Sequence, residues 1–229
     1  LLIDTGVVGL GFWVFIWGAY FFEIFKRWRI ATDDNARSIL LGSIAPTLGF
    51  LAGGFFETNF YDSEMVMLLY FIMGMSLANV TSRIWVLQTD RIIPQLDKVI
   101  QFSLIMFVAF SMFSISITQI SFSIGVLAWL LKIHFTKSWK IIKGTPVGLP
   151  ILCFCLASIL AVITSVDFET SLKPLKKLFQ FAVFFWVANS VENEKQKDLL
   201  IKLLIISGIL ASLVGFSQAW TTAVGLQTR

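Results

Sequence analysis

Three closely spaced lysines, Lys173, Lys176 and Lys177, are the residues of this sequence best suited to bind an anion. On an α-helix their i, i+3 and i+4 spacing places them on one face. Pro174 suits the first turn of such a helix, and Ser171 is a suitable N-cap. The free N–H groups of a helix start add to ammonium charges, so we expect an anion site. Contact with lipid phosphate and snorkelling of the lysines are the alternatives.

A second segment, from Gly54 to Glu64, is acidic and contains no basic residue. It carries Glu57, Asp62 and Glu64, together with Asn59, and aromatic residues stand on both sides of the acids. One hypothesis is that these four residues line an external cavity that positions sugars or a catalytic loop. The other is an acidic interfacial loop within an aromatic belt.

Residue types that carry common enzyme chemistry or bind metals are sparse. The single histidine, His134, lies in a basic segment, and the two cysteines, Cys153 and Cys155, lie in one apolar run. Positions i and i+2 of a helix point to different sides, so neither a disulfide nor a metal pair is expected. We find no phosphate-binding glycine loop, zinc motif or nucleophile elbow, and we assign no catalytic or metal-binding residue.

The composition predicts the environment in which these segments work. Of the 229 residues, 57% are hydrophobic and only 14% are charged, whereas soluble domains have about 25% charged residues. Such a chain needs the bilayer as its solvent. The net charge of +4 comes from basic residues between apolar runs rather than from a continuous patch, so nucleic acid is not an expected partner. The fold class is therefore all-α, a polytopic bundle of transmembrane helices that contacts membrane lipids.

About eight continuous apolar runs could each cross a bilayer. The run over residues 99–131 is too long for one span, and a polar cluster from Ser114 to Ser123 interrupts it, so we expect a tight hairpin there. The predicted spans are roughly 7–25, 38–56, 65–87, 99–116, 118–134, 147–165, 178–191 and 199–220.

Basic residues predict the orientation of these spans, because they gather on the cytoplasmic side. If residue 1 is outside, most of the basic residues lie in segments on the inside. Lys202 lies in the last span and is counted on neither side. The hairpin matters, because without it the basic segment Lys132–Lys143 would lie outside. The inside set is Lys26, Arg27, Arg29, Arg37, Arg83, Arg91, Lys98, Lys132, Lys137, Lys140, Lys143, Lys195 and Lys197, and the outside set is Lys173, Lys176, Lys177 and Arg229.

Short motifs occur over nearly the whole chain and fall into two blocks. In residues 1–90 they are Asp4-Thr5-Gly6-Val7-Val8-Gly9, Gly54-Phe55-Phe56-Glu57, Asn59-Phe60 and Asp62-Ser63-Glu64. In residues 91–229 they are Ser114-Ile115-Ser116, Gln119, Thr145 to Pro150, Ser165-Val166-Asp167, Ser171-Leu172-Lys173, Lys176-Lys177 and Val187-Ala188-Asn189. These motifs resemble the superfamily of O-antigen ligases and O-antigen polymerases, in an unusual order: the first block resembles the carboxyl-terminal membrane spans of that family, and the second resembles its amino-terminal spans.

This resemblance implies glycan transfer at the periplasmic face of the bacterial inner membrane. The expected donor is a glycan linked to undecaprenyl diphosphate, and the acceptor is a lipid A-core sugar or another glycan. No nucleotide sugar, metal or other cofactor is implied. Basic residues near the leaving diphosphate would stabilise its charge, which is the role the resemblance gives to Lys173, Lys176 and Lys177.

The family's central membrane block and large periplasmic loop have no match in the chain, nor have its catalytic histidine and arginines. The expectations are therefore a fragment, a junction of two tandem members or a circular permutation, and whether the chain is itself an enzyme stays open. Two other classes compete: a transporter or flippase for lipid-linked glycans, and a non-catalytic assembly subunit. Charged residues inside spans are typical of transporters, and the predicted spans contain few.

Overall fold

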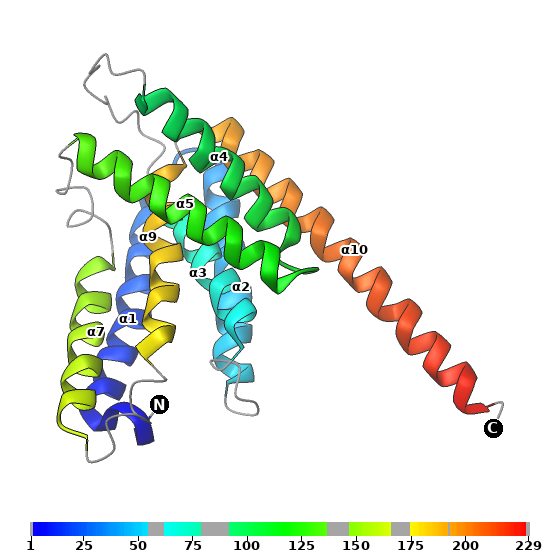
Figure 1. The fold of residues 1–229 in the computed structure, drawn as a ribbon, viewed down its shortest axis with the longest axis horizontal. Coiled ribbons are helices and arrows are strands. Elements are labelled where there is room, and N and C mark those ends of the chain that lie inside the picture. The colour runs from blue at the N-terminus through cyan, green and yellow to red at the C-terminus, as the bar shows by residue number, and fades with distance from the viewer. Residues whose placement is uncertain are drawn as a thin grey trace. The chain divides into compact units, whose positions relative to one another are not determined.

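A computed structural model describes residues 2–54, 62–78, 92–136, 147–165, 175–191 and 193–227. This part of the chain is almost entirely helical and contains no strand, as the sequence predicted. The helices, shown in Figure 1, are α1 (Leu2–Ile30), α2 (Asp34–Gly53), α3 (Ser63–Leu77), α4 (Ile92–Phe110), α5 (Ile115–Thr136), α7 (Gly148–Ile163), η2 (Lys176–Gln180), α9 (Phe181–Ser190) and α10 (Glu194–Gln227).

Five of these helices are long and apolar enough to cross a membrane: α1, α2, α4, α5 and α10. Their large apolar side chains are widely exposed, for example Phe22 on α1, Leu127 on α5 and Phe216 on α10. An exposed apolar surface of this extent marks contact with lipid rather than water. The chain is therefore a multi-pass membrane protein.

The three other predicted spans correspond to α3, α7 and the pair η2–α9, which are shorter. The 15 residues of α3 extend about 22 Å at 1.5 Å per residue, less than the roughly 30 Å of a bilayer core. Both α3 and α9 are almost completely buried, through residues such as Phe71, Met73, Phe184 and Trp186. They form the core of their unit rather than its lipid-facing surface.

The predicted break between the fourth and fifth spans is present, but it lies earlier than expected. Helix α4 ends at Phe110, and α5 begins at Ile115. The hydroxyl of Thr118 donates to the Ser114 carbonyl at 2.8 Å, and that of Ser123 donates to the Gln119 carbonyl at 2.8 Å. Because each hydroxyl bonds to a carbonyl four residues earlier, these polar residues are accommodated in α5 instead of interrupting it.

The helices divide into two compact units. The first contains Leu1–Asn79 and Ile133–Val191, and the second contains Val80–Lys132 and Glu192–Arg229. The sequence predicted a domain boundary between residues 90 and 91. Residues 79–91 lie outside the described residues, so this boundary stays a prediction.

Within the first unit the helices pack in pairs. Helices α1 and α7 pack side by side and run in opposite directions (Figure 1). Helices α3 and α9 also pack together, but they are parallel, because Tyr70 stacks on Phe181 while Gly74, one turn later, faces Phe184 and Val187. The predicted topology also makes α3 and α9 parallel, but the membrane sides that it gives to their ends stay a prediction.

Polar contacts tie three helices of the first unit together. The buried Tyr20 hydroxyl donates to Ser43 Oγ of α2 at 3.0 Å and lies 3.1 Å from Ser76 Oγ of α3. Arg27 of α1 donates to the Leu77 carbonyl at the end of α3, at 3.0 Å. A guanidinium there satisfies a carbonyl that the helix leaves unpaired. These contacts bring the ends of α1 and α3 to the same side, as the predicted orientation does.

Candidate functional site

The predicted site residues are only partly covered by the described part of the chain. Glu57, Asn59 and Lys173 lie outside the described residues. Lys176 begins η2, and its side chain is not described. Of the remaining three, Asp62 is exposed, whereas Glu64 and Lys177 are half-buried.

Asp62 and Glu64 form the capped start of α3. Asp62 is the N-cap, with extended backbone angles, and its carboxylate accepts from the Glu64 N–H at 3.1 Å. Partial burial, and then the neighbouring Asp62 carboxylate, raise the pKa of Glu64 above its ordinary value. The acidic segment therefore ends in a helix cap that holds two carboxylates close together.

Helix η2 corrects one expectation about the lysines. The sequence predicted an α-helical face shared by Lys173, Lys176 and Lys177, but the described part of this segment is a 3-10 helix. With three residues per turn, positions three apart are aligned, so Lys177 shares its face with Gln180. Gln180 is buried, whereas Phe179 is 75% exposed. Lys177 is thus turned toward the protein, while Phe179 is turned away from it.

Glu64 and Lys177, far apart in sequence, lie toward the same end of the first unit. Helix η2 packs against α3, and the rings of Tyr70 and Phe181 stack with centroids 4.6 Å apart. Glu64 precedes Tyr70 by about 9 Å along an α-helix. Lys177 precedes Phe181 by about 8 Å along a 3-10 helix. Glu64 and Lys177 therefore lie at about the same height in the bundle.

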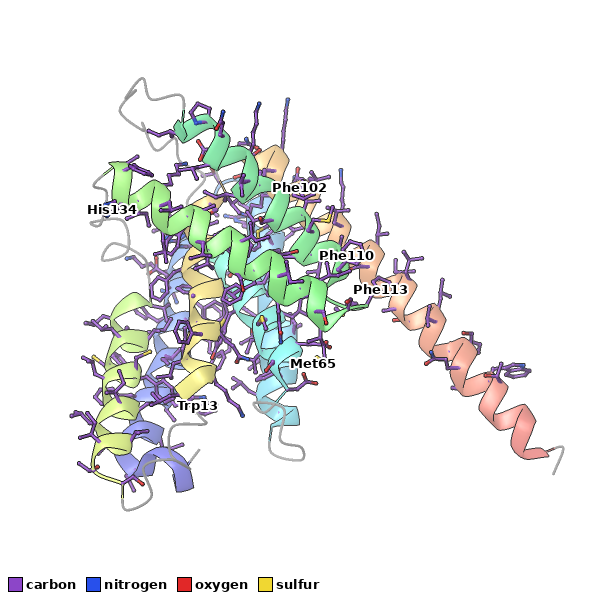
Figure 2. All side chains as sticks on the ribbon, viewed as in Figure 1. Trp13, Met65, Phe102, Phe110, Phe113 and His134 are labelled. Atoms are coloured by element: carbon purple, nitrogen blue, oxygen red, sulfur yellow. The ribbon has the colours of Figure 1, made fainter. Side chains whose placement is uncertain are left out.

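Other side chains at this end favour contact with lipid. Met65, labelled in Figure 2 at the start of α3, is 53% exposed. The exposed Phe179 of η2 is also apolar. A half-buried lysine and exposed apolar groups suit an amphipathic ligand with an anionic group and a hydrocarbon tail, whereas the two carboxylates can accept hydrogen bonds only from its neutral polar groups. Among the described residues no group of three or more His, Cys, Asp or Glu side chains could hold a metal ion.

Glu64 gives a pH-dependent prediction. Its raised pKa means that the folded protein disfavours the charged carboxylate. This penalty is absent below the ordinary carboxylate pKa and develops as pH rises through the raised value. We expect Glu64→Gln to increase the thermal unfolding temperature slightly at pH 7.5 and to leave it unchanged near pH 4. Asp62→Asn keeps a capping side chain but removes the neighbouring charge, so it should reduce the gain. An equal effect of Glu64→Gln at both pH values would contradict this explanation.

Sequence reasoning missed one charged contact in the second unit. Lys132 of α5, whose side chain is 4% exposed, forms an ion pair with Asp97 of α4. The sequence interpretation placed Lys132 in a basic inside loop, but it is a buried residue of α5. The sequence did contain a pattern that could have predicted this ion pair. An acidic residue lies near the start of α4 and a basic residue near the end of α5, and a helical hairpin brings these two ends together.

The chain was compared with protein-family models, curated proteins and solved structures, and no significant match was found.

Proposed function

We propose that this chain is the membrane part of a glycosyltransferase of the O-antigen ligase type. It binds a glycan linked to undecaprenyl diphosphate at the periplasmic face of a bacterial inner membrane, for transfer to a lipid A-core or glycan acceptor. The observation that supports this most is that α3 packs against η2, with Glu64 and Lys177 at about the same height in the first unit. The sequence resemblance supports the choice of donor.

The chemistry assigned to each side of this site follows from its charge. Ammonium groups of Lys173, Lys176 and Lys177 bind the diphosphate and stabilise the charge that it carries away. Carboxylates accept hydrogen bonds from sugar hydroxyls, so Glu57, Asp62 and Glu64, with Asn59, line the cavity for the glycan. The groups that carry out transfer are not assigned to this chain.

The proposal includes eight membrane crossings. Residues 57–64 and 166–177 lie outside, whereas 26–37, 83–98, 132–143 and 192–198 lie inside. In a background with Cys153→Ser and Cys155→Ser, we expect Lys140→Cys to react with a membrane-impermeant thiol reagent only after the cytoplasmic side is opened. Reaction of Lys140→Cys from the periplasm would mean that the second half of the proposed topology is inverted.

A photoreactive donor tests the proposed function directly. A diazirine placed next to the diphosphate of a lipid-linked glycan should crosslink to the peptide that contains residues 173–180. A lipid-linked glycan without the photoreactive group should compete, whereas the free polyprenol should not. Crosslinking confined to other helices would remove this segment from the site.

Transport of a lipid-linked glycan is the second candidate. The ion pair of buried Lys132 with half-buried Asp97 favours it, because charged residues inside membrane proteins often mark transport pathways. Proteoliposomes that contain a fluorescent lipid-linked glycan separate the two candidates. If an external quencher rapidly removes the fluorescence of donor that started in the inner leaflet, the protein transports it. Donor binding without this loss of inner-leaflet fluorescence supports the glycosyltransferase proposal.

A further inference from the structure

We propose that Asp97 and Lys132 form a latch that closes the α4–α5 hairpin and fixes its orientation in the membrane. The ion pair joins Lys132 Nζ to Asp97 Oδ1. The lysine side chain is 4% exposed and the aspartate side chain 27% exposed, so the pair is largely shielded from solvent. It is therefore unlike an ordinary surface ion pair, which contributes little to stability.

The ion pair lies at the open end of the α4–α5 hairpin, opposite the turn. The turn at 111–114 connects α4 and α5 at one end. Asp97 lies near the beginning of α4 and Lys132 lies near the end of α5, so the ion pair joins the two helices at the opposite, open end of the hairpin. Helix α4 packs against α10, and the ion pair joins α4 directly to α5.

Burial makes the charge of Lys132 depend on Asp97. A buried ammonium without its partner carboxylate is strongly destabilising, whereas removal of both charges is tolerated better. A lysine near a span end can also escape toward water if the helix shifts or reorients. The pair therefore favours the arrangement in which α5 returns to the side where α4 began. That arrangement keeps the basic segment Lys132–Lys143 inside.

A charge-swap experiment tests the latch, with Lys140→Cys as reporter in the background Cys153→Ser and Cys155→Ser. We expect Asp97→Asn or Lys132→Gln alone to increase periplasmic labelling of the reporter at least about fivefold. The charge swap, Asp97→Lys with Lys132→Asp, should return the labelling to within about twofold of the wild-type level. Exposed Lys98, next to Asp97, provides the matched control: Lys98→Gln removes the same charge as Lys132→Gln and should leave labelling unchanged.

The swap also decides the outcome if the single variants fail to accumulate. A swapped protein that accumulates and labels like the wild type supports the latch. A swapped protein as defective as either single variant overturns it, because the pairing of opposite charges would then be irrelevant. Equal effects of Lys98→Gln and Lys132→Gln would overturn it as well, since net charge alone would explain the labelling.

Discussion

Gly74→Val is expected to destabilise the protein by about 2 kcal/mol or more, because this site has no room for a larger side chain. A Cβ atom at Gly74 would lie 2.9 Å from Val187 Cβ and 3.0 Å from the Phe184 carbonyl oxygen. The oxygen belongs to the backbone of α9 and cannot rotate away, so α3 and α9 must separate. Thermal unfolding in mild detergent, followed by size-exclusion chromatography, measures the loss.

Two further variants separate close packing from a general effect of glycine replacement. A Cβ atom at Gly42 of α2 would have no other atom within 4 Å, so Gly42→Ala should leave stability unchanged or raise it slightly. Val187→Ala removes methyl groups that face Gly74, so the double variant Gly74→Ala with Val187→Ala should lose less than the two single losses added together. Equal losses from Gly74→Ala and Gly42→Ala would contradict the close contact of α3 and α9.

The replacement of Lys173, Lys176 and Lys177 by Gln is expected to lower affinity for the lipid-linked donor at least about tenfold, which corresponds to about 1.4 kcal/mol. Charge-assisted hydrogen bonds to an anion contribute roughly 1.5–3 kcal/mol each when shielded. Exposure at the headgroup level reduces this contribution, and the carboxylates of Asp167 and Glu169 partly offset the charge. Donor binding to the purified protein in nanodiscs measures the change.

A matched triple variant controls for net charge. Lys137, Lys140 and Lys143 form another lysine group of the same size, and the proposed topology places it inside. Their replacement by Gln changes the net charge equally and should leave donor affinity unchanged. A loss of the same size in both triple variants would assign the effect to overall charge rather than to the proposed site.

Composition and apolar runs were sufficient to predict an all-helical, multi-pass membrane protein, because the need to satisfy backbone polar groups in lipid leaves few structural choices. The polar cluster near Ser114 also predicted the hairpin. Its position was harder to predict from sequence, since Ser and Thr hydroxyls can either accompany a turn or bond to carbonyls within a helix. Thr118 and Ser123 do the latter.

Tertiary contacts account for what the sequence could not predict at the candidate site. The lysine spacing was interpreted for an α-helix, whereas Lys177 lies in a 3-10 helix that packs against α3. The sequence indicated close packing for the glycines of α2, Gly42 among them, but Gly42 faces open space and Gly74 is the glycine that contacts α9. Only the fold shows that Glu64 and Lys177 lie toward the same end of one unit.

Donor binding in nanodiscs of purely zwitterionic lipid tests the central claim, that the lysine segment binds the diphosphate of the donor. Without anionic lipid, general attraction to the membrane surface disappears, and only contacts with the donor itself remain. We predict that the wild-type protein still binds the donor, and that the variant with Lys173, Lys176 and Lys177 replaced by Gln binds it at least about tenfold more weakly. Equal affinities of the two proteins in these nanodiscs would contradict the claim.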